Sequence, residues 1–318
     1  STDSVAVNMI KDQSPSAILG SVQSNGSLYS LNPNGIIFGE GAQVDTRGLV
    51  AAAMEIDGFN SDHQVASDAE RQDFLDGSLL DGIKDGNAFL VNAQDMVEGT
   101  DDLPRIVIKP GASITSDNAP ILLAGPEVIN EGALQSDQGQ VVLAGTRKDL
   151  YLAVSDNDAD LRGFLVEVDS GDGDERGSVV NAGSIISNLG NVTLVASEIL
   201  QAGKITATSS VDSNGSIRIV ARDQAEVFTD AQLAESSAQL DALYFDGNGV
   251  QGEAGKAGQK RAEIPNVGAV AVGSEAGQIV IAKDSITQVL PQSLAPGFIK
   301  SQVDGLSLAD KDALRLLD

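Results

Sequence analysis

The hydrophobic residues of this chain fall in short runs that alternate with glycine and asparagine. A typical stretch, residues 130–145, has a turn with Asn or Gly, a short strand-prone run, a polar turn, a second run and then Ala. Apolar runs of this length between turn residues favour β-strands over helices. The pattern therefore predicts an all-β chain.

This two-strand unit occurs six times, the last time over residues 266–272 and 277–282. The first strand of each copy has an apolar residue at an equivalent position: Val44, Ile114, Leu134, Ile185, Ile205 and Val270. The steps between these positions are 70, 20, 51, 20 and 65 residues. The two steps of 20 give the size of one unit, and the longer steps contain additional material.

A repeat of about 20 residues with Gly and Asn corners is typical of a parallel β-helix, in which each coil buries its apolar face against its neighbours. We therefore predict an all-β, right-handed parallel β-helix, a single-stranded solenoid, over residues 1–284. It has loop and hairpin excursions at about 53–104, 146–176 and 223–264. Residues 285–318, where the repeat fades, form a C-terminal cap or a linker.

The three excursions differ in pattern. Residues 53–104 are charged and loop-like, whereas residues 146–176 contain two strand-like runs and form either a further coil or a hairpin. In residues 223–264, Leu233, Leu240 and Leu243 are spaced at roughly helical intervals, which indicates a short helix before a Gly-rich and Lys-rich loop.

Composition limits the classes of function. Of 318 residues, 42% are hydrophobic and only 3% aromatic, so the core is built from small, repeated contacts. A net charge of −26 argues against nucleic-acid binding and indicates either a soluble extracellular surface or cation binding. The chain has no cysteine for a disulfide or a thiolate nucleophile, and no apolar run approaches the ~18 residues of a spanning helix.

One turn has residue types that favour a tight turn more strongly than those of the other turns. In Asn32-Pro33-Asn34-Gly35, proline fixes φ at the second position and Asn-Gly tolerates positive φ. The flanking residues 26–31 and 36–38 are short and strand-prone. The turn therefore joins two strands.

The residues around this turn resemble the haemagglutination-activity, or two-partner secretion (TPS), domain of filamentous-haemagglutinin-like exoproteins. The resemblance rests on a Ser-Ala-Ile-Leu-Gly run at 16–20, on Asn-Pro-Asn-Gly-Ile, and on the following Phe-Gly, Gly-Ala and Gly-Leu-Val-Ala. It implies that Asn32, Pro33, Asn34, Gly35 and Ile36 form the secretion motif. The family also has an earlier Asn-Pro-Asn-Leu segment that is not found here, so we expect the chain to begin partway into the domain.

The resemblance implies a non-enzymatic exoprotein or adhesin, secreted to the bacterial cell surface through the periplasm. Its partner would be an outer-membrane barrel transporter of the TpsB type, together with a glycan or cell-surface ligand. Two alternatives stay open. One is the stalk of a two-partner-secreted cytolysin or contact-dependent toxin, and the other is a β-helical polysaccharide lyase.

Candidate chemistry is sparse, and no catalytic residue is predicted. Asp169, Asp172 and Asp174 lie in a Gly-rich turn and are candidate Ca²⁺ ligands, although a solvated turn needs no metal. The single histidine, His63, stands among loop residues without a nucleophile motif. Residues 247–252 spell G-x-G-x-x-G, but the Gly-rich sequence after them indicates a loop and not a dinucleotide site.

Overall fold

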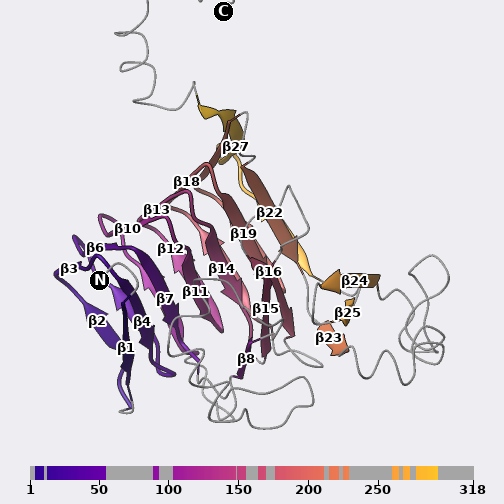
Figure 1. Ribbon diagram of the computed structural model, residues 1–318, viewed down its shortest axis with the longest axis horizontal. Coiled ribbons are helices and arrows are strands. Elements are labelled where there is room, and N and C mark those ends of the chain that lie inside the picture. Colours follow the sequence, from indigo (N-terminus) through magenta and orange to yellow (C-terminus); the bar gives the residue numbers. More distant parts are fainter. Residues whose placement is uncertain are drawn as a thin grey trace, which may run out of the picture.

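The chain winds through three parallel sheets in turn, as the computed structural model in Figure 1 shows. The structure describes residues 4–10, 13–54, 89–92, 103–147, 149–154, 164–169, 176–210, 215–221, 225–228, 260–264, 268–272 and 277–292. Within these ranges, no α-helix is present and strands make up nearly all the regular structure. The predicted helix in residues 223–264 lies outside the described residues.

Each of the three sheets has seven strands. Sheet A consists of β1 (Val5–Met9), β4 (Ser27–Leu31), β7 (Gly48–Ala52), β11 (Ile121–Gly125), β14 (Val141–Gly145), β19 (Asn191–Ala196) and β22 (Ser216–Ala221). Sheet B consists of β2 (Ser16–Ile18), β5 (Ile36–Phe38), β9 (Arg105–Ile108), β12 (Glu127–Asn130), β17 (Ser178–Asn181), β20 (Glu198–Gln201) and β26 (Gln278–Ile281). Sheet C consists of β3 (Ser21–Gln23), β6 (Gln43–Thr46), β10 (Ser113–Asp117), β13 (Ala133–Asp137), β18 (Ser184–Asn188), β21 (Lys204–Ser209) and β27 (Ile286–Pro291).

The fold is a parallel β-helix, as predicted. Five of the six positions taken as equivalent in the sequence are equivalent in space, because Val44, Ile114, Leu134, Ile185 and Ile205 pair in register along sheet C. All five side chains are buried in one core cluster. The repeated apolar position therefore marks the inside of each coil.

The sixth copy of the repeat was predicted wrongly. Val270 lies in β25 (Gly268–Val272), which pairs antiparallel with β23 (Ala225–Phe228) and β24 (Lys260–Ile264) outside the solenoid. The residue in register with Ile205 is Thr287 in β27. The solenoid therefore continues to Pro291, past the boundary expected at residue 284.

The excursion at 146–176 forms a hairpin, one of the two alternatives that its sequence allowed. Its strands β15 (Asp149–Val154) and β16 (Phe164–Asp169) pair antiparallel. A third strand, β8 (Phe89–Asn92), pairs with β15 and comes from the earlier excursion, a connection that the sequence did not predict. We call these three strands the hairpin sheet.

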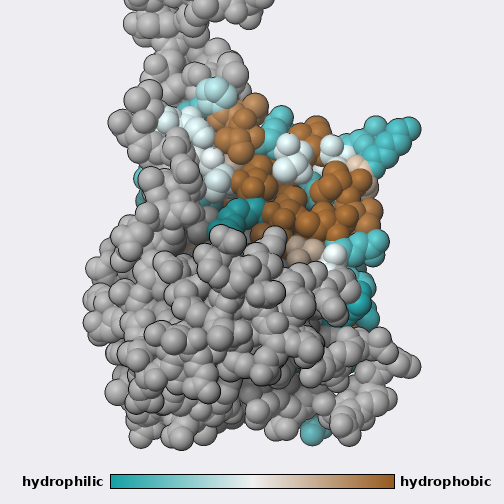
Figure 2. All heavy atoms as spheres, turned by 90° about the vertical axis from the view of Figure 1, so that its right-hand side faces the viewer, coloured by the Kyte–Doolittle hydropathy of each residue, from teal (hydrophilic) through white to brown (hydrophobic). Residues whose placement is uncertain are grey.

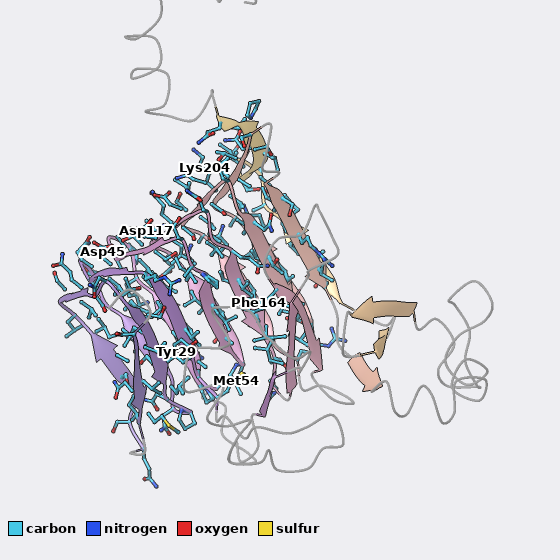
Figure 3. The ribbon with its side chains drawn as sticks, viewed as in Figure 1. Tyr29, Asp45, Met54, Asp117, Phe164 and Lys204 are labelled. Atoms are coloured by element: carbon cyan, nitrogen blue, oxygen red, sulfur yellow. The ribbon has the colours of Figure 1, made fainter. Side chains whose placement is uncertain are left out.

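The middle strands of sheet A, β7, β11, β14 and β19, are buried on both faces. The inner residues of the sheet join the solenoid core, whereas its outer residues form a second cluster with Leu150, Leu152, Phe164, Val166 and Val168 of the hairpin sheet. In Figure 3, Tyr29, Met54 and Phe164 lie on this side, while Asp45, Asp117 and Lys204 follow the edge formed by sheet C. This double burial explains the unbroken apolar run in β11 and β14.

The last described coil leaves apolar side chains uncovered. Figure 2, which looks from the β22 side of Figure 1, shows hydrophobic surface gathered at this end. The exposed large hydrophobic residues of β26 and β27 are Ile279, Val280, Ile281, Ile286 and Val289. Ile279 and Ile281 are in register with the buried Ile199 and Gln201, so they occupy inward positions that no described strand covers.

Candidate functional site

The Asn32-Pro33-Asn34-Gly35 turn is the corner between sheets A and B. It joins β4 to β5, so the sequence prediction of a turn between two strands is confirmed. The N–H of Gly35 donates to the carbonyl oxygen of Asn32 at 2.9 Å, which closes a four-residue β-turn. Oδ1 of Asn32 accepts from the backbone N–H of Asn34 at 2.9 Å and from its Nδ2 at 3.1 Å.

Asn32 connects three successive coils. Its side-chain Nδ2 donates to the carbonyl oxygen of Ser14 and to Oγ of Ser16, each at 2.9 Å, in the coil before it. Its backbone N–H donates to the carbonyl oxygen of Ala52 at 2.9 Å, in the coil after it. Asn32 is completely buried. Because Asn32 is buried and its polar groups are hydrogen-bonded to three coils, it fixes the position of these coils relative to one another.

Gly35 is required by the geometry of the corner. Its φ of +109° lies in the region that side chains disfavour, and a Cβ there would stand 2.8 Å from the carbonyl oxygen of Arg105. Ile36, which follows, is completely buried in the core. The five predicted motif residues therefore form one packed corner.

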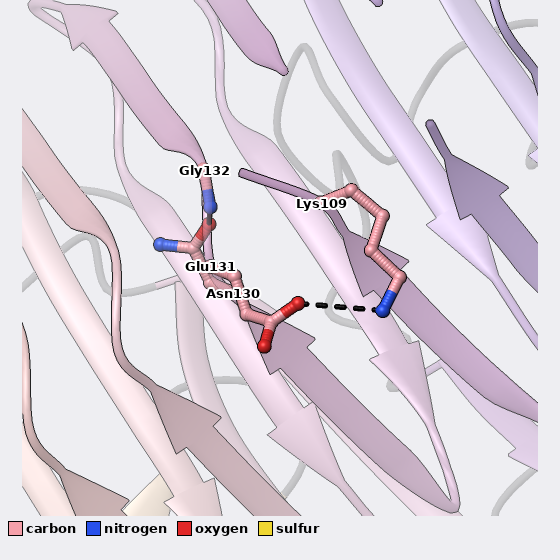
Figure 4. A network of polar contacts seen from close by, with 4 residues as sticks. All are labelled: Lys109, Asn130, Glu131 and Gly132. Carbon is pink, nitrogen blue, oxygen red and sulfur yellow. Dashed lines mark hydrogen bonds and ion pairs between the residues drawn. The ribbon is translucent and has the colours of Figure 1, made fainter. Parts of the chain in front are cut away.

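A ladder of buried amides lies at the other end of the sheet B strands. Nδ2 of Asn130 donates to Oδ1 of Asn181 at 2.8 Å, and Nδ2 of Asn181 donates to Oε1 of Gln201 at 2.7 Å. Oδ1 of Asn130 also accepts from the N–H of Gly132 at 3.2 Å, a pair drawn in Figure 4. Sequence reasoning missed the ladder, although Asn and Gln at the strand ends of three copies were its signal.

One further buried amide holds the hairpin sheet against sheet A. Oε1 of Gln140 accepts from the N–H of Phe164 at 2.7 Å, and its Nε2 donates to the carbonyl oxygen of Phe164 at 3.0 Å. Nε2 also donates to Oγ1 of Thr193 at 2.9 Å. The side chain therefore pairs with Phe164 as a neighbouring strand would, which fixes the hairpin on the solenoid.

Charged side chains on sheet B pair between coils. Nε of Arg105 lies 2.6 Å from Oε2 of Glu127, and Nζ of Lys109 lies 3.4 Å from Oε2 of Glu131, the contact dashed in Figure 4. NH1 of Arg176 lies 3.5 Å from Oε1 of Glu198. These side chains are partly exposed to solvent, so each pair contributes little to stability but favours correct register.

Most of the other sequence candidates lie outside the described residues. Asp169 ends β16, whereas Asp172 and Asp174 lie outside the described residues, as do His63 and residues 247–252. Among the residues that the structure describes, no group of three or more His, Asp or Glu side chains could hold a metal ion. The described ranges also contain no helix long and apolar enough to cross a membrane.

The described residues define a parallel β-helix with a packed Asn-Pro-Asn-Gly corner, and comparison with known proteins gives the family. The family model described as the TPS secretion domain matches residues 1–236. The chain therefore belongs to the TPS secretion domain family of two-partner secretion exoproteins.

Two individual relatives from Haemophilus influenzae agree with this assignment. The chain is 29% identical over 146 residues to the heme/hemopexin-binding protein, a match that covers 45% of this chain and 13% of that protein. It also matches the crystal structure of the HMW1 secretion domain, with a TM-score of 0.52 and 23% identity, over 70% of this chain and 50% of that one. The second match shows the fold, and neither extends over most of the relative's length.

Proposed function

We propose that the Asn32 corner directs export, and that the exoprotein is a non-enzymatic adhesin displayed at the bacterial cell surface. The chain passes through an outer-membrane barrel transporter of the TpsB type. The corner then folds early and gives the following coils a template on which to stack. The observation that carries this proposal is the position of Asn32, whose hydrogen bonds join the first three coils.

A parallel β-helix is slow to begin folding. Each sheet pairs residues from different coils, so the first coils lose chain entropy before stacking repays it. A turn with a fixed proline φ and an internal hydrogen bond lowers that cost. The corner therefore suits the part of the chain that emerges and folds first.

The export role can be separated from stability with Asn34→Ala. Asn34 has no positive φ, so alanine fits the backbone, and the variant loses the 3.1 Å bond from Nδ2 to Asn32 while keeping the bond from its N–H. We expect secretion by cells that carry the transporter to fall several-fold, while the purified variant keeps a strand-rich far-UV spectrum. Asn118→Gly, at an exposed corner of sheet C, is the matched control and should be secreted normally. Normal export of Asn34→Ala rules the role out.

The adhesin part of the proposal concerns attachment to a glycan or cell-surface ligand. In the coils that the structure describes, buried amides such as Asn32, Asn181 and Gln140 hold coils together, so binding falls to surfaces and excursions. A glycan array and binding to intact cells test this directly. Retention of the purified chain supports an adhesin. Absence of binding to both favours the stalk of a cytolysin or toxin, and cleavage of an acidic polysaccharide would favour the lyase.

A further inference from the structure

The outer face of sheet B has an unbroken row of apolar side chains. The residues in register at this position, one from each strand, are Ala17, Ile37, Val107, Ile129, Val180, Leu200 and Val280. On either side of Val107 in β9, Ile106 and Ile108 are buried in the core. Because side chains alternate along a strand, the row faces away from the core. We call it the sheet B stripe.

The stripe is only partly covered in the described structure. Val107 is buried with 8% of its surface exposed, Ile129, Val180 and Leu200 are half-buried, and Val280 is 44% exposed. The strands of sheet B make their main contacts with each other and with sheet A across the core. With strands about 4.8 Å apart, seven positions make an apolar line about 29 Å long. A continuous apolar surface of this kind indicates an interaction site.

Both flanks of the stripe are charged in two adjacent coils, those of β9 and β12. On one side Arg105 of β9 is followed by Glu127 of β12, and on the other side Lys109 is followed by Glu131. From β9 to β12, both flanks therefore change from basic to acidic. In the next coil on each side, the flanking positions hold Gly35, Gly39, Ser178 and Ala182, which are small and uncharged. One coil further, Glu198 of β20 lies on the same flank as Glu127 and pairs with Arg176 of its own chain.

The flank charges of two copies are complementary when the copies are related by one particular two-fold axis. A two-fold axis along the strand direction, between β9 and β12, reverses the order of coils in a second copy and keeps each flank over the same flank. Arg105 then faces Glu127 of the partner subunit, and Lys109 faces Glu131 of the partner subunit. An axis parallel to the solenoid would instead place Arg105 against Lys109 of the partner subunit, so like charges would meet.

We propose that the sheet B stripe is the contact between two copies of this chain, packed face to face with antiparallel solenoid axes. The apolar rows meet along the centre, with Val107 against Ile129 of the partner subunit and Ile37 against Val180 of the partner subunit. Both copies have the same strand spacing, so each side chain of one row lies opposite a side chain of the other along the whole line. The contact is narrow, which makes the association weak and dependent on concentration.

Sedimentation velocity of the purified chain over a concentration series tests the surface. We expect a monomer–dimer equilibrium that Ile129→Lys weakens about tenfold or more. The matched control is Ile186→Lys, because Ile186 is also a half-buried, outward-facing isoleucine but lies on β18 of sheet C. A chain that stays monomeric throughout, or equal weakening by both variants, overturns the proposal.

A charge reversal tests the symmetry without disturbing the fold. The variant Arg105→Glu, Glu127→Arg, Lys109→Glu, Glu131→Lys keeps the ion pairs within each copy with their signs reversed. It should dimerise as well as the wild type, but a mixture of the two should contain few mixed dimers by native mass spectrometry, since like charges then face each other. Statistical mixing of the two chains would show that this antiparallel contact is wrong.

Discussion

Two sets of buried amides hold the sheet B strands, and they differ in what they bind. Asn32, before β5, bonds to its own turn and to two other coils, mostly through backbone groups. In the ladder, Asn130, Asn181 and Gln201 at the ends of β12, β17 and β20 bond to one another, and the two end members also bond to groups outside the set. The residue in register with Asn130 in β9 is Ile108, which is completely buried.

The difference is between a junction and a set of residues that share bonds with each other. In the ladder, the Asn130–Asn181 and Asn181–Gln201 bonds have both donor and acceptor within the set, so exchanging the three residues for apolar ones together removes both partners of each bond. One coil earlier, the apolar Ile108 already occupies the position of Asn130. At the corner, two of the groups bonded to the Asn32 side chain, the carbonyl oxygen of Ser14 and the N–H of Asn34, are backbone atoms that no substitution removes. Removing the Asn32 side chain leaves buried polar groups without hydrogen-bond partners, which lowers the free energy of unfolding more than removing donor and acceptor together.

The largest effect is expected from Asn32→Ala. It removes the hydrogen bonds of Asn32 to Ser14, Ser16 and Asn34 from a completely buried site, and we expect the free energy of unfolding to fall by about 3 kcal/mol. Chemical denaturation of the purified variant measures this loss. A change as small as that of a surface substitution would show that the corner is not a junction.

A smaller effect is expected from Asn181→Leu, and part of the lost stability should return when the other ladder residues are changed as well. The single change leaves Nδ2 of Asn130 and Oε1 of Gln201 without their partner and should cost about 2 kcal/mol. Changing all three ladder residues to leucine or isoleucine should cost less than the sum of the three single changes, because donors and acceptors leave together. Chemical denaturation of the single and triple variants measures these losses. Strictly additive losses would contradict the distinction between the ladder and the Asn32 corner.

The smallest effect is expected from Glu131→Gln. Its partner Lys109 is half exposed and the two groups are 3.4 Å apart, so we expect a change below about 0.5 kcal/mol that disappears in high salt. Measuring stability at low and high salt checks this. A loss comparable to that of Asn181→Leu would place surface charge, and not buried amides, in control of coil register.

Much of the fold follows from local sequence, and the exceptions share one physical reason. The inward positions Val44, Ile114, Leu134, Ile185 and Ile205 and the Asn32 turn could be predicted because each coil repeats its own turn and strand pattern. The assignment of Val270 to a coil was wrong because a short apolar strand has the same sequence pattern whether it stacks in a coil or pairs in a hairpin. The pairing of β8 with β15 joins distant segments, for which the local pattern contains no signal.

The candidate site was predictable in part. The turn chemistry of Pro33 and Gly35 located the corner, but the reach of Asn32 to Ser14, Ser16 and Ala52 depends on how coils stack. The Gln140 contact with Phe164 depends likewise on where the hairpin docks. Such long-range bonds are properties of the assembled solenoid and not of any short stretch.

The most direct test of the template role is pulse-labelled hydrogen exchange during refolding. The account predicts that the amides of Ser16 and Asn32, which bond to Gly35 and Ala52, are protected before those of Ala182 and Ala202, which bond to Asn130 and Asn181 in the ladder coils. Asn34→Ala should delay the first set while leaving the final protection pattern unchanged. Earlier protection of Ala182 and Ala202 would contradict the claim that the solenoid begins at the Asn32 corner.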